Sequence, residues 1–299
     1  MNYRIALAGV CLLFFSCAGT QVVKTDTQDT SSSKEQVPKG TALEKQGSQK
    51  TAPKTITVQV PVEIKSVIKF ADGSIDEYTT SEYDDEFKTL LFQTRYSASG
   101  ALVEHTEYKY IEGKLVEKTI KDHEDKIISK RTFTYGPSGL VTDETVIDGN
   151  GKLISAFEYA YDAQNNKIAW IVKNNNNTKV AETRYAYKDG KVQSAELTDA
   201  TGKKNGYSTY EYDSVGNLSV ISYYNASGSL LRKEVSYWDK GLLKKEERSS
   251  AGGQVMQRTA YEYGPNQEII RKTIEDLQGK SKQIIEYEYT NRTEIRMVE

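Results

Sequence analysis

The chain has 299 residues, of which 37% are hydrophobic and 27% are charged. This composition excludes a thick apolar core and predicts a polar fold. Forty Lys and Arg stand against 42 Asp and Glu, and the net charge of -2 gives no long-range attraction for nucleic acid or an anionic membrane. Nucleic acid is therefore not an expected partner.

The first segment, residues 1–16, has the features of a secretory signal peptide. Arg4 gives it a basic start, and an apolar run from Ile5 to Phe15 follows. This run of 11 residues is too short to span a bilayer as a helix, which needs about 20 residues. The segment therefore predicts export of the rest of the chain.

The run from Phe14 to Gly19 resembles a bacterial lipobox, in which a small residue precedes a cysteine that is diacylated and becomes the mature N-terminus. Ser16 and Cys17 fit this pattern, whereas Phe14 replaces the usual Leu. The other cysteine, Cys11, lies within the signal, so cleavage leaves Cys17 without a disulfide partner. The resemblance implies a lipid anchor at Cys17. An ordinary signal peptide with an incidental cysteine is the alternative.

Residues 17–55 are rich in Ser, Thr, Lys, Gln and Gly and nearly lack large apolar side chains. Such a segment buries too little apolar surface to offset the entropy lost on ordering. We expect a disordered tether that holds a folded domain away from a membrane. With the lipobox, this predicts a bacterial envelope protein, anchored at the outer membrane or cell surface rather than the inner membrane.

The most informative feature is a repeat in residues 106–299, marked by pairs of tyrosines two residues apart. The pairs, with two substitutions, are Tyr108/Tyr110, Phe133/Tyr135, Tyr159/Tyr161, Tyr185/Tyr187, Tyr210/Tyr212, Val235/Tyr237, Tyr261/Tyr263 and Tyr287/Tyr289. The second members are 25 or 26 residues apart, and 14 of the 21 tyrosines fall in these pairs. This regularity indicates a tandem array.

Each repeat contains two turn signals, and strand-forming residues separate them. One turn follows the tyrosine pair, and the second has Asp, Asn or Ser at its first place and usually Gly at its fourth, as in Asp148–Gly151. The first residue accepts a backbone hydrogen bond, and glycine takes a positive φ. Each unit is therefore predicted to be a β-hairpin.

These units predict an all-β fold, an antiparallel meander of about eight two-stranded hairpins that forms a twisted or spiral sheet. The two rings of Tyr-x-Tyr point to one face, because side chains alternate along a strand, and the opposite face is mostly polar. We expect the aromatic face to lie inside the spiral. Residues 56–105 are predicted to be an N-terminal β cap or degenerate repeat.

The runs Glu158–Asp162, Glu211–Leu218 and Tyr261–Gly264 resemble the YD repeats of the RHS and wall-associated families. The resemblance covers about residues 108–289, although the Tyr-Asp dipeptide is kept in only two units. It implies a structural role, since in those families the repeats form β-strand spirals or shells on secreted and surface proteins. A second resemblance, to spirochaetal surface lipoproteins, rests on composition and the lipobox.

Signals for catalytic, metal and cofactor chemistry are weak. Neither His105 nor His123 has partners at metal-ligand spacing. The segment Asp148–Lys152 lacks the third acidic place and the bidentate Glu of a calcium loop. No Gly-x-x-x-x-Gly-Lys phosphate loop is present. We therefore expect no enzyme activity, metal or cofactor.

Two features could mark a binding surface. Trp170 and Trp238 could be platforms for carbohydrate, although strand packing and turn cover are the preferred interpretations. The polar turn Asn174–Asn177 could be a binding loop or a tolerated insertion.

The leading hypothesis is a non-enzymatic, lipid-anchored envelope scaffold that binds a protein or polysaccharide. The alternatives are a carbohydrate hydrolase with its site in a groove of the repeats, and a purely structural envelope component. The partner's identity and the oligomeric state stay open.

Overall fold

The computed structural model describes residues 54–298. The predicted signal peptide, the anchor at Cys17 and nearly all of the predicted tether lie outside the described residues. Among residues 54–298 there is no helix with the length and hydrophobicity needed to cross a bilayer.

The described residues form eighteen β-strands joined by short turns. In chain order they are β1 (Lys54–Phe70), β2 (Ile75–Tyr83), β3 (Leu90–Ser97), β4 (Leu102–Ile111), β5 (Lys114–Asp122), β6 (Ile127–Tyr135), β7 (Val141–Asp148), β8 (Leu153–Tyr161), β9 (Lys167–Lys173), β10 (Lys179–Lys188), β11 (Lys191–Asp199), β12 (Lys204–Tyr212), β13 (Leu218–Asn225), β14 (Leu230–Asp239), β15 (Leu242–Ser250), β16 (Val255–Tyr263), β17 (Ile269–Asp276) and β18 (Ser281–Val298).

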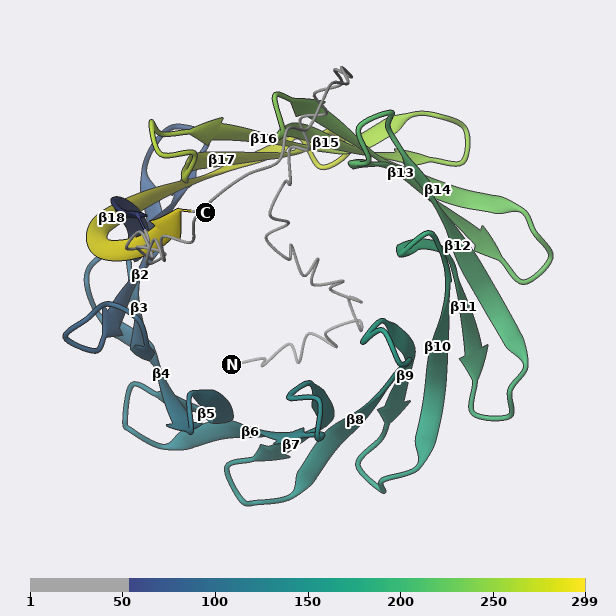
Figure 1. Ribbon diagram of the computed structural model, residues 1–299, viewed down its shortest axis with the longest axis horizontal. Coiled ribbons are helices and arrows are strands. Elements are labelled where there is room, and N and C mark those ends of the chain that lie inside the picture. The colour runs from purple at the N-terminus through teal and green to yellow at the C-terminus, as the bar shows by residue number, and fades with distance from the viewer. Residues whose placement is uncertain (1–53, 299) are drawn as a thin grey trace, which may run out of the picture. The chain divides into compact units, whose positions relative to one another are not determined.

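The strands form a closed antiparallel barrel, and Figure 1 shows the ring that they make. Each strand pairs with its neighbour in the chain, and β1 pairs with both β2 and β18. The prediction of about eight hairpins in a twisted or spiral open sheet was therefore wrong. The sheet closes because β1, from the segment predicted to be a cap, supplies the partner that the last strand of the array lacks.

The turns between strands depend on residues that tolerate a positive φ. In the turn between β7 and β8, Gly151 has a φ of 80°, and its N–H donates to the Asp148 carbonyl oxygen (3.0 Å). The Asp148 carboxylate also accepts from the backbone N–H groups of Asn150 and Lys152, both at 2.9 Å. The side chain at the first place thus stabilises the turn that reverses the chain.

The last of these turns departs from the predicted pattern. Between β17 and β18 the positive φ of 52° falls on Lys280 and not on Gly279, the fourth residue counted from Asp276. The Asp276 carboxylate accepts from the backbone N–H groups of Gln278 and Gly279, both at 3.0 Å. A Cβ on Gly279 would lie 2.6 Å from Asp276 Oδ2, so a larger residue there would require the Asp276 carboxylate to move.

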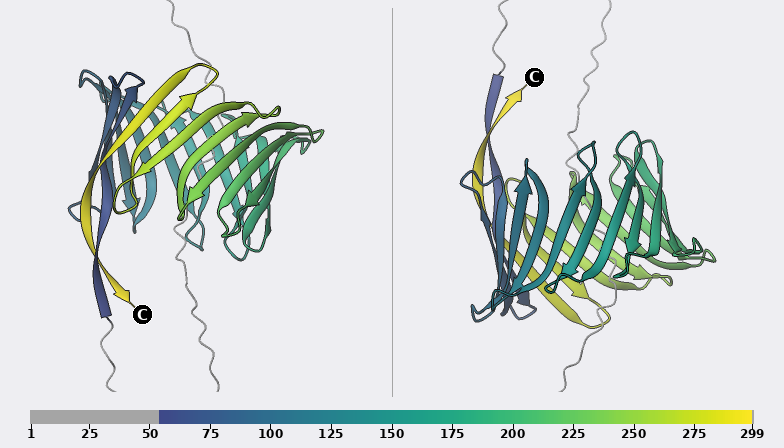
Figure 2. Two further views of the ribbon diagram at one scale, coloured as in Figure 1. Left: turned by 90° about the horizontal axis from the view of Figure 1, so that it is seen from above. Right: turned by 90° about the horizontal axis from the view of Figure 1, so that it is seen from below.

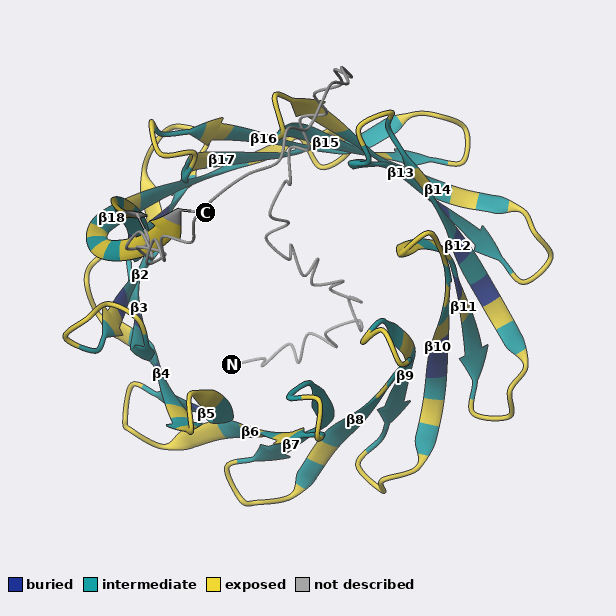
Figure 3. Cartoon of the chain, viewed as in Figure 1, coloured by how far each residue is buried: buried dark blue, intermediate teal, exposed yellow. Residues whose placement is uncertain are grey.

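The barrel is one sheet thick and has no apolar core between layers. Figure 3 shows that most of its wall is intermediate in burial. Several of the most buried side chains are small and polar, including Thr106, Thr119, Ser208 and Ser222, which is 1% exposed. Their cross-strand neighbours are larger, with Ile120 opposite Thr106 and Lys233 opposite Ser222, so packing within the sheet supplies burial that a second layer would otherwise give.

Two strands are much longer than the others. β1 has 17 residues and β18 has 18, and residues 54–62 pair with residues 290–298 beyond the ring. Figure 2 shows both strands extending past the end of the barrel. We call this two-stranded extension the terminal ribbon.

Candidate functional site

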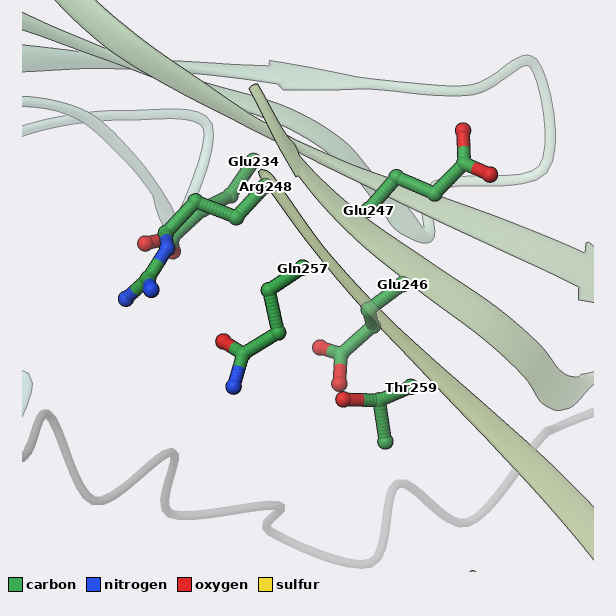
Figure 4. A pocket seen from close by; sticks show the side chains of 6 residues that line it. All are labelled: Glu234, Glu246, Glu247, Arg248, Gln257 and Thr259. Carbon is green, nitrogen blue, oxygen red and sulfur yellow. The ribbon is translucent and has the colours of Figure 1, made fainter. Parts of the chain in front are cut away.

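The two sides of the barrel wall differ in their side chains. Figure 4 shows Glu246, Gln257 and Thr259 projecting toward the inside of the ring from β15 and β16, while Glu247 projects the other way. Tyr261 lies on the inner side, because its hydroxyl donates to the Glu246 carboxylate (2.5 Å). We call the side that carries the tyrosine pairs the lumenal face and the opposite side the outer face.

The second tyrosine of most pairs holds two neighbouring strands together. Backbone pairing between β5 and β6 stops at Glu117 and Thr132, and beyond it the Tyr135 hydroxyl donates to the Leu115 carbonyl oxygen (2.7 Å). The same bond to the carbonyl 20 residues earlier is made by Tyr83, Tyr161, Tyr187, Tyr212, Trp238, Tyr263 and Tyr289. The side chain thus closes the opening between successive hairpins.

One unit was assigned to the wrong residues. The pair Val235/Tyr237 was predicted, but the Trp238 indole N–H makes the equivalent bond, to the Leu218 carbonyl oxygen (2.8 Å). Tyr237 lies on the outer face, where its hydroxyl donates to the Glu247 carboxylate (3.0 Å). Tryptophan supplies the same ring and donor here, and a pattern of tyrosines alone does not include it.

Three first tyrosines make a second kind of lumenal bond. Their hydroxyls donate to the residue 15 positions earlier: Tyr108 to Gln93 at 2.5 Å, Tyr159 to Glu144 at 2.8 Å and Tyr261 to Glu246 at 2.5 Å. These polar partners lie on the lumenal face, so this face is aromatic and charged rather than only aromatic. A comparison of the residues 15 before each first tyrosine would have found them in the sequence.

The polar side chains gather most clearly on β14, β15 and β16. Glu234, Glu246, Arg248, Gln257 and Thr259 project together from the lumenal face and line a shallow pocket (Figure 4). We call this set the lumenal patch. It combines carboxylate, guanidinium, amide and hydroxyl groups, all of which form directional hydrogen bonds.

Aromatic rings flank the lumenal patch on both sides. The Tyr223 hydroxyl donates to Glu234 (2.9 Å), and the Arg232 guanidinium lies 3.7 Å from the centre of the Tyr223 ring. Burial, followed by the hydrogen bond to Glu246, raises the pKa of Tyr261, and burial next to the Glu234 charge raises the pKa of Tyr223. Both phenols therefore stay protonated donors across the physiological range.

The outer face is covered by ion pairs between strands. A continuous chain of them crosses four strands, joining Lys245 to Glu247 (3.1 Å), Glu247 to Arg258 (2.9 Å), Arg258 to Glu275 (3.7 Å) and Glu275 to Lys282 (3.5 Å). Lys245, Glu247 and Arg258 lie inside β15 and β16, whereas Glu275 and Lys282 lie at the turn between β17 and β18. Hydrocarbon would leave such charges unsolvated, so the outer face suits water.

The lumen is wider than the side chains of its own wall can fill. Eighteen strands at the usual spacing and tilt give a backbone diameter of about 35 Å. Side chains that reach inward by about 6 Å from each side leave a central space of about 20 Å. The lumenal face therefore presents its tyrosines and charges to a volume large enough for a polymer chain.

The two histidines occupy different positions. His105, on the outer face of β4, has Nδ1 2.9 Å from Thr94 Oγ1, and its ring stacks on Phe92. His123 is an exposed turn residue beside Glu124. Within residues 54–298, His, Cys, Asp and Glu side chains do not form a group of three that could hold a metal ion.

The structure also places the other candidate binding residues. Trp170 lies on the lumenal face, where its ring stacks on Phe157 with centroids 6.2 Å apart. Trp238 packs at the start of a turn and makes the interstrand bond described above. Residues Asn174–Asn177 form a tight turn between β9 and β10, in which the N–H of Asn177 donates to the Asn174 carbonyl (2.9 Å). These residues do not meet in one site.

No family model matches the chain, and no curated protein matches it. A crystal structure of a porin-like protein from Bacteroides uniformis is similar at 9% identity with a TM-score of 0.42, covering 76% of this chain and 98% of that one. A porin-like protein from Bacteroides vulgatus has 12% identity and a TM-score of 0.25, covering 77% and 99%.

The complex TcdB2-TccC3-Cdc42 is similar at 15% identity with a TM-score of 0.33, and the similarity covers 74% of this chain but 14% of that one. All three TM-scores are below 0.5, so these similarities assign neither a family nor a function to this chain. The YD-repeat resemblance stays an interpretation of the sequence.

Proposed function

We propose that this chain is a non-enzymatic, lipid-tethered barrel of the bacterial cell envelope that binds a polysaccharide on its lumenal face. The observation that carries the proposal is the lumenal patch between Tyr223 and Tyr261. Planar polar groups next to aromatic rings suit a sugar, whose hydroxyls need paired donors and acceptors and whose C–H faces pack on rings.

A free charge in the patch supports binding there rather than a purely structural role. Within the described part of the chain Arg248 has no ion-pair partner, although Glu234 and Glu246 line the same pocket. On the outer face, by contrast, the carboxylate of Glu247 is occupied by Lys245 and Arg258. The lumenal patch therefore keeps donor capacity that the outer wall has already used.

The proposed position of the barrel is in water next to a membrane. Charged side chains on both faces favour this over insertion into the bilayer. The proposed anchor is the diacylated Cys17, with the segment between Cys17 and β1 as the tether. Metabolic labelling with an alkyne fatty acid should mark the wild-type chain and not a Cys17→Ser variant, which should also leave the membrane fraction. Unchanged fractionation of this variant would contradict the anchor.

Glycan binding is tested by calorimetric titration of the full chain with peptidoglycan glycan strands, a neutral β-glucan and an acidic polysaccharide. Arg248→Ala should weaken binding of the recognised glycan by about tenfold, equivalent to about 1.4 kcal/mol. Lys233→Ala is the matched control, because Lys233 is a cation on the outer face of the neighbouring strand β14. Equal losses in both variants, or no binding to any of the three glycans, would contradict the proposal.

A carbohydrate hydrolase is the second candidate, because Glu234 and Glu246 line one pocket and two carboxylates are the usual catalytic groups of glycosidases. Both carboxylates already accept a tyrosine hydroxyl, from Tyr223 and Tyr261 respectively. Analysis of the glycan recovered after binding distinguishes the two functions. A hydrolase produces new reducing ends, and Glu246→Gln abolishes them. A binding protein returns the glycan intact.

A further inference from the structure

The terminal ribbon leaves one strand edge without a partner. Backbone pairing of β17 with β18 ends at Arg271 and Glu286, so within residues 54–298 no strand pairs with the β17-facing side of β18 from Thr290 onward. Successive residues of an antiparallel strand point their N–H and C=O groups to opposite sides, so every second residue on the free side of β18 has an unpaired donor and acceptor within the described chain. An isolated two-stranded ribbon is marginally stable, and such an edge is a template for another strand.

The opposite edge of the ribbon is less accessible. Arg292 reaches across β1, and its Nη1 donates to the carbonyl oxygen of Phe87 in the turn between β2 and β3 (2.9 Å). β1 also carries Pro61, which has no N–H to donate. The free edge of β18 is therefore the one that can accept a further strand.

Two of the exposed side chains on this edge strand are large and apolar. Ile295 is 74% exposed and Met297 is 78% exposed, and on β1 Ile56 is 50% exposed. Ile295 and Met297 are among the most exposed large apolar side chains of the described residues. Water contact at both Ile295 and Met297 is unfavourable, and a partner that covers the strand removes it.

We propose that the edge of β18 pairs antiparallel with the same edge of a second copy of this chain, so that two terminal ribbons form one four-stranded sheet. A two-fold axis at Ile295 would place this residue against its own counterpart. The same register sets Glu294 opposite Arg296 of the second copy and Thr293 opposite Met297. The strand is thus self-complementary, as a two-fold interface requires.

Charge arrangement favours a second copy over an unrelated strand. Glu294 lies between Arg292 (2.7 Å) and Arg296 (2.9 Å), so one carboxylate serves two guanidinium groups within each ribbon. In the proposed register each Arg296 gains the Glu294 of the other copy. The interface is small, so the dimer is weak in dilute solution and favoured where copies are concentrated on one surface.

Cysteine cross-linking of the full chain in membranes of the producing cells tests the register. Antiparallel partners have Cα atoms about 4.5–5.5 Å apart, within the range of a disulfide. Ile295→Cys should therefore form a covalent dimer under mild oxidation. The matched control is Thr57→Cys, because Thr57 is exposed and pairs with Ile295 across the ribbon, but on the far strand. The wild-type chain controls for Cys11 and Cys17.

A dimer from Ile295→Cys alone supports the proposal, and equal cross-linking of both variants, or of neither, overturns it. A second measurement uses Ile295→Lys, which should sediment as a monomer at a concentration where the wild type is dimeric, with an unchanged melting temperature. A dimer that survives this substitution would also overturn the proposal. Glycan binding plays no part in either experiment, so the two proposals fail independently.

Discussion

The indole N–H of Trp238 donates to the carbonyl oxygen of Leu218 at 2.8 Å, the same bond that tyrosine hydroxyls make elsewhere in the barrel. One example is Tyr212, whose hydroxyl donates to the Val192 carbonyl at 2.9 Å. This position in the repeat therefore requires an aromatic side chain that is long enough to cover the opening between hairpins and has a hydrogen-bond donor at its tip.

Removal of that donor should destabilise the barrel. Tyr212→Phe keeps the ring and leaves the Val192 carbonyl without its partner, so we expect a loss of about 1 kcal/mol in the free energy of unfolding. Trp238→Tyr keeps a donor at the tip and is the matched variant, with a smaller expected loss. Denaturant unfolding followed by tryptophan or tyrosine fluorescence measures both. An unchanged free energy in Tyr212→Phe would show that the bond does not stabilise the fold.

Backbone conformation should decide the effect of turn substitutions. Gly151 has a φ of 80°, and a Cβ there would meet nothing within 4 Å, so the only cost of Gly151→Ala is the left-handed backbone. We expect Gly151→Ala to lower the free energy of unfolding by about 1–2 kcal/mol. Gly252→Ala is the control in another turn, where φ is not positive and the nearest atom to a Cβ is 3.9 Å away.

Gly252→Ala should leave the free energy of unfolding unchanged or raise it by about 0.4–1 kcal/mol, because alanine restricts the conformations of the unfolded chain. Thermal unfolding of the two variants beside the wild type measures the difference. Equal losses at Gly151 and Gly252 would contradict the assignment of the left-handed conformation to Gly151.

The lumenal tyrosines predict a loss of stability at alkaline pH. Burial raises the pKa of Tyr108 and of Tyr185 to about 12, from an ordinary value of about 10. Because the folded pKa is the higher one, the native state holds these protons more tightly. The contribution of these two tyrosines to the free energy of unfolding is therefore fully present below about pH 10 and is lost as the pH rises toward 12.

Absorbance at 295 nm follows this ionisation directly. In the native protein a group of tyrosines should ionise well above pH 10, and unfolding in denaturant should bring them back to the ordinary value. Denaturant midpoints measured at pH 8, 10 and 11 should fall only above pH 10. Ionisation of every tyrosine near pH 10 in the native state would contradict their burial.

The proposed position of the barrel beside a membrane predicts that its outer wall is accessible to water. Thr132 is exposed on the outer face in the middle of β6, and its neighbours across the strands are Glu117 and Thr145. Thr132→Cys should react with a charged maleimide in cells whose outer membrane has been permeabilised. Lys126→Cys, in the turn between β5 and β6, is the control for a site outside any bilayer. Reaction at residue 126 without reaction at residue 132 would indicate that the wall lies in lipid.

The repeat could be found in the sequence because it rests on local chemistry. The turn at Asp148–Gly151 depends on one acceptor side chain and one residue with a positive φ, and alternation along a strand puts Tyr159 and Tyr161 on the same side. Such patterns are complete within a few neighbouring residues. The prediction was wrong where a different residue makes the same bond, as Trp238 does in place of tyrosine.

Closure of the barrel was decided only by the tertiary structure. It depends on β1 pairing with β18, in a register that brings together Lys65 and Glu288, 223 positions apart. Nothing local marks these strands as partners, because the twist of each strand accumulates around the ring and sets where the two ends meet.

The lumenal patch, like the closure of the barrel, was decided only by the tertiary structure. Glu234, Glu246 and Gln257 look like ordinary solvated residues of separate units in the sequence, and only the register of β14, β15 and β16 places them in one pocket. The sequence by itself therefore determined the hairpins and, except on β14, which side of a strand carries the tyrosine pair, because turn and strand preferences act over a few residues. The number of strands, their closure and the meeting of polar groups inside depend on pairing between distant segments, which only the folded ring defines.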